Sequence, residues 1–169
     1  MNPSPSQPPA PAAPPLRHET TAGNYFVANY PPFAFWKKEA VPEFEAALRT
    51  PHSAPAPSLG LYAHIPVCRK RCHFCYFRVY TDKNAEDIRG YIDVLLKELA
   101  VYAAKPVIGG RKPKFIYFGG GTPSYLSPDQ LKFLTDGMKR LLPWDEAEEV
   151  TFEAEPGTLT DHKLQATCN

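Results

Sequence analysis

Apolar and polar positions follow two different periods along the second half of the chain. Short, largely apolar runs are typical of buried strands, and three such runs occur at residues 59–65, 115–118 and 150–154. Segments with apolar residues at helical spacing follow these runs, at about residues 85–104, 127–142 and 159–165. A strand followed by a helix, repeated three times, predicts an α/β fold with a parallel sheet and right-handed crossovers.

The predicted helices differ in how clearly their ends are marked. The second begins with Ser127 as a capping residue, Pro128 in the first turn and Gln130 at the third helical position, the pattern of a capping box. Its expected buried face carries Leu131, Leu134, Met138 and Leu141. The first helix shows a comparable stripe, made of Ile88, Tyr91, Ile92, Leu95, Leu99 and Tyr102.

The first third of the chain has a different composition. Residues 1–22 are rich in proline and small polar residues and cannot bury enough apolar surface to offset chain entropy, so we predict a disordered tail. A proline-rich docking ligand is the functional alternative for this tail. Residues 23–50 form an aromatic-rich arm with a short helix expected over 41–48, and residues 51–58 are a predicted linker to the main domain at 59–169.

The aromatic-rich arm has two open interpretations. Six aromatic side chains lie close together in it, at Tyr25, Phe26, Tyr30, Phe33, Phe35 and Trp36. They either pack against the main domain or cover a flat substrate as a lid, and the sequence favours neither.

Composition limits the functional classes. The net charge of +1 and the lack of a basic stripe exclude the usual nucleic-acid binder. No apolar run approaches the roughly 20 residues of a membrane helix, and the start of the chain lacks the apolar core of a signal peptide. The clustered cysteines indicate a reducing compartment, so we expect a cytoplasmic protein.

Three of the four cysteines, Cys68, Cys72 and Cys75, follow the first predicted strand in the spacing C-x3-C-x2-C. Their short separation allows all three thiolates to meet at one metal centre. A [4Fe–4S] cluster held by three cysteines keeps one iron open for a small molecule, whereas structural zinc normally takes four protein ligands. Zinc completed by His73 is the minor alternative, and Cys168 is interpreted as unpaired and incidental.

Two further motifs follow the second and third predicted strands. Glycines 119–121, followed by Thr122, allow the backbone to approach a ligand closely, although a tight turn is their structural alternative. Glu153 and Glu155 are expected on one side of the third strand, where an ion pair is the simpler role. Ligands gather at the carboxyl ends of parallel strands, so the three motifs are expected to meet there.

Together these motifs resemble the radical S-adenosylmethionine (SAM) superfamily, in particular its oxygen-independent coproporphyrinogen III oxidase branch. The resemblance covers about residues 59–164 and includes Tyr62-x-His64-Ile65-Pro66-x-Cys68, the aromatic Phe74 before Cys75, Gly119–Ser124 and Phe152–Thr158. It implies a partial TIM-type barrel, of which this length provides about three strand–helix units. We therefore expect the amino-terminal part of such an enzyme, with a fragment or a degraded gene copy as explanations.

The resemblance also implies roles for individual residues. Cys68, Cys72 and Cys75 would hold the [4Fe–4S] cluster. The residues expected at SAM are Tyr62, Phe74, Gly120, Gly121, Thr122 and Glu153. His64 is expected to pack near the cluster on the side of Tyr62, whereas relatives often have Asn or Asp where this chain has Glu155.

The chemistry implied by the family is reductive cleavage of SAM to a 5′-deoxyadenosyl radical, acting on a small molecule, here a tetrapyrrole. An electron donor such as flavodoxin or ferredoxin is the implied partner. Arg69, Lys70 and Arg71 would favour an anionic cluster, meet a propionate, or form a solvated loop. The alternatives are a haem chaperone, a radical SAM methyltransferase, or a non-catalytic iron–sulfur or haem-binding protein. The oxidase has a further cysteine where this chain has Phe77.

Overall fold

The computed structural model describes residues 35–75 and 77–168, with side chains described up to residue 165. The chain divides into two compact units, Met1–Trp36 and Lys37–Asn169, and every element below belongs to the second unit. The predicted tail at 1–22 and most of the arm at 23–50 lie outside the described residues. The helix expected at the end of the arm is present as α1 (Val41–Arg49).

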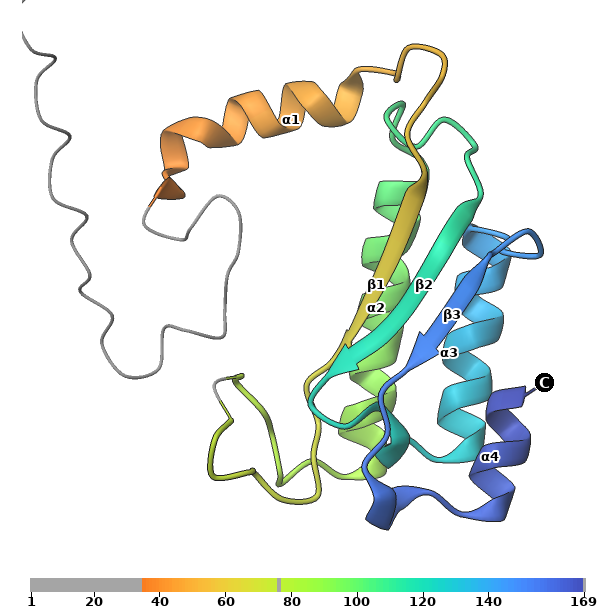
Figure 1. The fold of residues 1–169 in the computed structure, drawn as a ribbon. Coiled ribbons are helices and arrows are strands. Elements are labelled where there is room, and N and C mark those ends of the chain that lie inside the picture. The colour runs from red at the N-terminus through yellow and green to blue at the C-terminus, as the bar shows by residue number, and fades with distance from the viewer. Residues whose placement is uncertain (1–34, 76, 169) are drawn as a thin grey trace, which may run out of the picture. The chain divides into compact units, whose positions relative to one another are not determined.

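The second unit contains the predicted strand–helix alternation (Figure 1). Its remaining helices and strands are, in chain order, β1 (Leu59–Ile65), α2 (Ala85–Ala103), β2 (Pro113–Gly120), α3 (Pro128–Leu141), β3 (Glu149–Phe152) and α4 (Asp161–Cys168). Short 3-10 turns lie at Lys38–Ala40, Pro123–Tyr125 and Pro156–Thr158. The described helices contain none that is long and apolar enough to cross a membrane.

The three strands form one parallel sheet in the order β1-β2-β3, which confirms the predicted α/β architecture. Both long helices, α2 and α3, lie on the same face of this sheet, and the described chain leaves the other face uncovered (Figure 1). The strands alternate between these two faces. Tyr62 therefore faces the uncovered side and is exposed, whereas Ala63 faces the helices and is buried.

The core fills the space between the sheet and the two helices. Strands β1 and β2 and helices α2 and α3 contribute its fully buried residues, which include Ile65, Ile92, Ile116, Leu134 and Met138. Removing such side chains from water is the main favourable term in folding. The helical stripes predicted from the sequence therefore pack as expected, although Tyr102, at the end of the first stripe, stays 37% exposed.

Local hydrogen bonds fix where the helices begin. The Gln130 backbone N–H donates to Ser127 Oγ, and the Ser127 N–H donates to Gln130 Oε1, so the predicted capping box is present. Asn84 and Asp87 form an equivalent box at the start of α2, which the sequence analysis did not identify. Each box satisfies backbone donors that have no partner within the helix.

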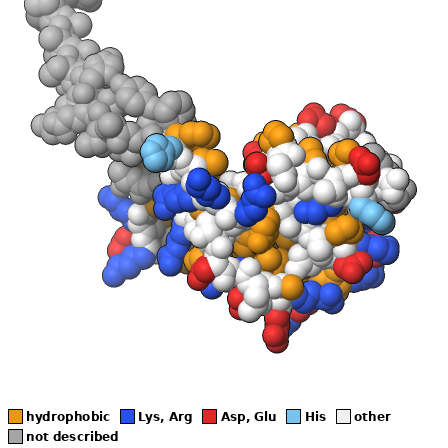
Figure 2. Space-filling model, turned by 90° about the horizontal axis from the view of Figure 1, so that it is seen from below, with side chains coloured by type: hydrophobic (Ala, Val, Ile, Leu, Met, Phe, Trp, Pro, Cys, Tyr) orange, Lys and Arg blue, Asp and Glu red, His pale blue; other side chains and the backbone are white. Residues whose placement is uncertain are grey.

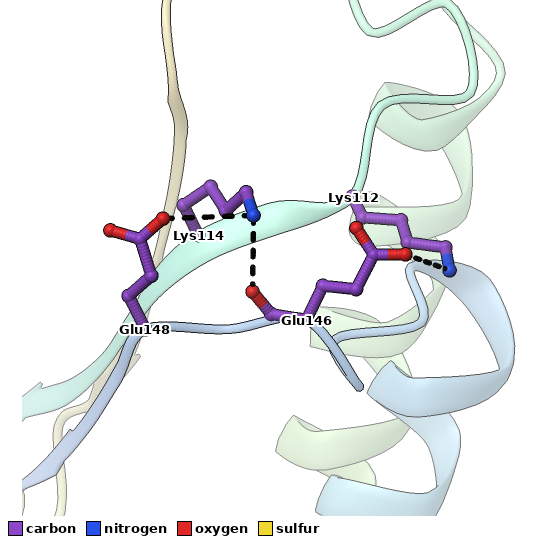
Figure 3. Close-up of polar contacts among 4 residues, drawn as sticks. All are labelled: Lys112, Lys114, Glu146 and Glu148. Atoms are coloured by element: carbon purple, nitrogen blue, oxygen red, sulfur yellow. Dashed lines mark hydrogen bonds and ion pairs between the residues drawn. The ribbon is translucent and has the colours of Figure 1, made fainter.

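Charged side chains fasten the amino-terminal ends of β2 and β3 (Figure 3). Lys112 Nζ lies 2.8 Å from Glu146 Oε1, and Lys114 Nζ lies 3.6 Å from Glu148 Oε1. Lys114 Nζ also donates to the Glu146 carbonyl at 3.4 Å, and the Glu148 N–H donates to the Lys114 carbonyl at 2.8 Å. The register between β2 and β3 is therefore set by both backbone and side-chain contacts at this end.

Candidate functional site

The cysteine loop leaves the carboxyl end of β1 and is tied down at its base. Val67 and Tyr80 form an isolated parallel bridge, in which the Tyr80 N–H donates to the Pro66 carbonyl at 2.8 Å. The Cys68 N–H donates back to the Tyr80 carbonyl at 3.0 Å. These bonds hold the two ends of the loop together, so Cys68 sits at a fixed point beside the sheet.

The three cysteines of the motif differ in their surroundings. All three are free thiols, and Cys68 is buried, Cys75 partly buried and Cys72 exposed. Cys72 and Cys75 share a tight turn, closed by the Cys75 N–H donating to the Cys72 carbonyl at 3.2 Å. Among the described residues, no three Cys, His, Asp or Glu side chains gather closely enough to hold a metal ion. The structure thus anchors Cys68 and leaves the other two thiols on an exposed turn.

The glycine run at the carboxyl end of β2, residues 119–121, lies directly against the start of this loop. The Gly121 N–H donates to the Ile65 carbonyl at 2.8 Å, and the Thr122 N–H donates to the Val67 carbonyl at 2.9 Å. A Cβ on Gly121 would stand 2.8 Å from both of these carbonyl oxygens and 3.0 Å from Cys68 Sγ. Only glycine therefore permits this contact between the two motifs.

Glu153 follows β3 and joins the glycine run through its carboxylate. Its Oε1 accepts a hydrogen bond from the Tyr117 hydroxyl at 2.6 Å, and its Oε2 accepts one from the Gly120 N–H at 3.2 Å. Gly120 has a φ of +111°, and a Cβ there would stand 2.6 Å from the His64 ring. The backbone at Gly120 thus takes a conformation and a space that other residues would not tolerate.

Tyr62 and His64 lie on the uncovered face beside this carboxylate, as expected from their spacing. The Tyr62 hydroxyl is 3.0 Å from His64 Nδ1, and the Tyr62 ring centroid is 5.8 Å from that of Tyr117. Burial raises the pKa of Tyr62, and the negative charge of Glu153 raises it further. Burial lowers the pKa of His64, although Glu153 opposes this. The face therefore presents a neutral phenol and a neutral imidazole near pH 7.

Tyr117 completes the hydrogen-bonded group and was not identified from the sequence. Its hydrogen bond to Glu153 raises its pKa, so the phenol remains a proton donor to the carboxylate. The period-two alternation from Gly119 back along β2 was the available signal, because it places Tyr117 on the same face. Glu153 is thus held by two donors from β2 rather than by a cationic partner, in contrast to the ion pair considered for it.

Glu155 does not share the face of Glu153, because β3 ends at Phe152. Its carboxylate instead accepts a hydrogen bond from the Gly157 N–H at 3.2 Å and caps the following 3-10 turn. The Glu155 N–H in turn donates to Ser124 Oγ at 3.0 Å. Its role in the described structure is therefore local.

A second polar group, also missed by the sequence analysis, joins the segments after β2 and β3. Ser124 and Thr158 are buried and their hydroxyls are hydrogen-bonded to each other. Lys163 Nζ, whose pKa is lowered by burial, donates to the Ser124 carbonyl at 2.6 Å. These contacts attach α4 to the end of the glycine motif.

Basic and aromatic side chains are exposed on the cysteine loop itself. Arg69, Lys70 and Arg71 are exposed, and Phe74, expected to flank the cofactor, is 79% exposed. Arg71 Nη2 donates to the Cys75 carbonyl at 3.0 Å and so supports the turn between the cysteines. Figure 2 looks onto this end of the molecule and shows Lys and Arg side chains gathered over part of it.

The residues present fit an iron–sulfur cluster. Thiolates are the protein ligands of such clusters, and three of them lie on one loop with a fixed base. A side chain at Gly121 would crowd Cys68, since even its Cβ would stand 3.0 Å from Cys68 Sγ. Because the other two thiols lie on an exposed turn, they can approach Cys68 without disturbing the sheet.

Comparison with known proteins agrees with the motifs. Residues 62–167 match the Radical SAM superfamily. The heme chaperone HemW of Escherichia coli is 40% identical over 106 residues, which cover 61% of this chain and 27% of that protein. The oxygen-independent coproporphyrinogen III oxidase of Synechocystis is 32% identical over 130 residues, which cover 76% of this chain and 27% of that protein.

The fold also matches a solved structure. Coproporphyrinogen III oxidase (HemN) from Escherichia coli, described as a radical SAM enzyme, superimposes with a TM-score of 0.60 at 28% identity. The match covers 78% of this chain and 29% of that one. It confirms that the three strand–helix units share the fold of a part of that structure. The chain spans less than a third of the length of these relatives.

Proposed function

The chain belongs to the radical SAM superfamily, and we propose that it forms the amino-terminal half of a site that cleaves SAM reductively. The observation that carries this proposal is the hydrogen bonding among the three motifs. The glycine run donates to the carbonyls at the start of the cysteine loop, and Gly120 donates to Glu153. Three segments distant in sequence thus meet at the carboxyl ends of the three strands.

In this proposal Cys68, Cys72 and Cys75 hold a [4Fe–4S] cluster. The turn at Cys72 and Cys75 closes onto Cys68, which supplies the fixed ligand at the sheet. When bound there, the cluster would provide the one electron, taken from an external reductant, that cleaves the sulfonium of SAM to methionine and a 5′-deoxyadenosyl radical. A three-cysteine set suits this role because it leaves one iron for the amino and carboxylate groups of SAM.

The SAM contacts are assigned to the residues that border these strand ends. Gly120, Gly121 and Thr122 are the proposed contacts in the glycine run, where the missing side chains allow the backbone to lie close to His64 and Cys68. Glu153 would accept hydrogen bonds from the cofactor, and its orientation is supported by Tyr117. Tyr62 and Phe74 would flank the cofactor, with Phe74 moving together with the cysteine turn.

The substrate proposed is a tetrapyrrole, whose four pyrrole rings offer apolar contact area. The uncovered face of the sheet carries an open hollow lined by Gly60, Leu61, Tyr62, Phe115 and Tyr117. The ring centroids of Phe115 and Tyr117 lie 6.1 Å apart with the rings tilted, and aromatic side chains of this kind can pack against the individual pyrrole rings of a tetrapyrrole. Coproporphyrinogen III oxidation is the corresponding reaction of the oxidase relatives.

An acidic electron donor such as flavodoxin or ferredoxin is the proposed partner, in a reducing cytoplasm. The exposed Arg69, Lys70 and Arg71 lie between the cluster cysteines, and such a basic surface favours association with an acidic protein. Charged groups at the edge of an interface mainly affect the association rate and its salt dependence.

The test is anaerobic reconstitution of the full chain with iron and sulfide, followed by reduction with dithionite in the presence of SAM. The proposal predicts that 5′-deoxyadenosine and methionine accumulate and that both disappear when Cys72 is replaced by alanine. A chain that carries a cluster but forms neither product contradicts reductive cleavage by these residues.

Haem binding without SAM cleavage is the second candidate, because the 40% identical relative is named a heme chaperone. In that case the uncovered aromatic face binds haem directly. The cluster-loaded chain would then shift the absorption of added haemin at near-stoichiometric ratio and form no 5′-deoxyadenosine. Absence of a haem-dependent spectral shift excludes this candidate.

A further inference from the structure

We propose that Thr122 is a positioning residue for the ligand Cys68, and that its hydroxyl raises the reduction potential of a cluster bound there. The Thr122 hydroxyl donates a hydrogen bond to Cys68 Sγ at 3.3 Å. This inference rests on the proposed function, since it assigns Cys68 to the cluster. It adds a role that differs from the contact with SAM expected for Thr122.

The backbone around Thr122 fixes the direction of this hydroxyl. The Thr122 N–H donates to the Val67 carbonyl, one residue before Cys68, and the preceding Gly121 N–H donates to the Ile65 carbonyl. Threonine is branched at Cβ, so its χ1 angle is restricted once the backbone is held. The hydroxyl is thus directed at the sulfur by the backbone hydrogen bonds of Thr122 itself and of the preceding Gly121.

The sulfur that receives this bond is the sheltered one. Cys68 is only 7% exposed, whereas Cys72 is exposed and Cys75 is partly so. The Cys75 thiol lies 3.8 Å from the Phe77 carbonyl and acts there as a donor. Among the described residues, Cys68 is therefore the ligand of the motif whose sulfur accepts a hydrogen bond from a side-chain hydroxyl.

The consequence follows from electrostatics. A hydrogen bond to a ligand sulfur is one of the factors that set the potential of an iron–sulfur cluster. Reduction adds one negative charge, and a donor aimed at the sulfur stabilises the more negative state more strongly. Water competes less for a sulfur that is largely buried, so the hydroxyl acts with less screening than at Cys72.

The first experiment measures the potential by EPR-monitored redox titration of the reconstituted full chain. Thr122→Val keeps the branched shape and removes the donor. It is expected to shift the one-electron reduction equilibrium roughly three- to tenfold toward the oxidised cluster, where tenfold corresponds to about 59 mV. Thr122→Ser keeps the hydroxyl and is expected to restore the wild-type potential.

Equal potentials in the wild type and Thr122→Val would overturn the proposal, as would a valine shift that serine does not restore. The second result would assign the shift to packing of the methyl group. Comparable iron content in the three proteins shows that the potential, rather than cluster assembly, has changed.

A second measurement uses the metal-free chain and does not depend on SAM chemistry. The Thr122 hydroxyl proton is expected to be protected from exchange with water in NMR spectra of the wild type and unprotected in Cys68→Ala. Equally fast exchange in both proteins overturns the hydrogen bond. If the chain forms no cluster, the proposed function fails, and this measurement still decides whether Thr122 holds Cys68.

Discussion

The two ends of the same three-stranded sheet are built on different principles. At the amino-terminal end, charged groups are paired with one another, as in the contact of Lys112 with Glu146 (Figure 3). At the carboxyl-terminal end, Glu153 forms no ion pair with a described residue and accepts hydrogen bonds from a phenol and a backbone N–H. In the cysteine loop that follows β1 at this end, Cys72 is exposed and Cys75 is partly buried.

This difference separates stability from chemistry within one sheet. At the amino-terminal end, charged side chains pair with one another. Arg111 also donates hydrogen bonds to the Pro57 and Val107 carbonyls there. The carboxyl-terminal end keeps donors, acceptors and space available for a ligand. In barrels of parallel strands, active sites lie at the carboxyl-terminal face, and the opposite face contributes stability. Substitutions at the two ends should therefore affect different properties.

The largest effect is expected from Cys72→Ala. Cys72 is exposed, and its carbonyl accepts the hydrogen bond that closes the turn, a backbone contact that alanine retains, so its replacement should leave the melting temperature unchanged. Iron incorporation after reconstitution should fall to background, because two cysteines cannot hold the cluster. The matched control is Cys168→Ala, for which wild-type iron content is expected. Iron loss in this control would show that Cys168 is also a cluster ligand.

Gly121→Ala should damage both properties at the carboxyl-terminal end. The new Cβ would press on the Ile65 and Val67 carbonyls at 2.8 Å, so the free energy of unfolding should fall by roughly 1–3 kcal/mol. Cluster content should fall as well, since the displaced segment includes Cys68. Urea denaturation and iron analysis measure the two effects.

The control for this substitution is Gly90→Ala in α2. A Cβ on Gly90 meets nothing within 4 Å, and alanine favours the helix, so stability should rise by about 0.5–1 kcal/mol. Cluster content should not change. Equal destabilisation of both variants would show that the close contact at Gly121 is not the cause.

Tyr117→Phe is a smaller change at the same end. It removes the phenol that donates to Glu153 while keeping the ring on the uncovered face. We expect a severalfold weaker binding of SAM, measured by equilibrium dialysis of the reconstituted protein, with stability close to that of the wild type. Unchanged affinity would show that Glu153 needs no support from Tyr117.

The smallest effect is expected at the amino-terminal end, from Glu146→Gln. The hydrogen bond from Lys112 lowers the pKa of Glu146, so the pair contributes stability above the ordinary value of 4.5. This contribution is lost as the pH falls through the lower pKa of the folded state. At neutral pH the melting temperature should drop slightly and cluster content should stay the same, because the pair is exposed and screened.

The pH and salt dependence provide the check on this last prediction. The difference in melting temperature between the wild type and Glu146→Gln should shrink in acid and at high salt. A difference that grows in acid would contradict the assigned direction of the pKa shift.

The sequence predicted the parts of the fold that depend on local patterns. The periodic apolar positions located the three strands and the long helices, and the Ser127 capping box marked the start of α3 correctly. The third strand was placed slightly late, at 150–154 rather than Glu149–Phe152. The sequence therefore placed Glu155 on the same side of the strand as Glu153, although β3 ends at Phe152.

Contacts between segments distant in sequence were harder to predict from the sequence. The meeting of the three motifs followed from the rule for strand ends, and the hydrogen bonds among them agree with that expectation. The support of Glu153 by Tyr117 and the buried pair of Ser124 and Thr158 depend on the register and on a turn after each strand. Neither feature has a period or spacing of its own in the sequence.

In the proposed function, the carboxyl-terminal end of the sheet binds a cluster and SAM as one site. EPR spectra of the reduced, reconstituted chain, recorded with and without SAM, test it most directly. If SAM binds at the open iron, the wild type gives a [4Fe–4S] signal that shifts when SAM is added. A cluster signal that is indifferent to SAM would contradict the claim, because the open iron and the glycine run would then not act on the same ligand.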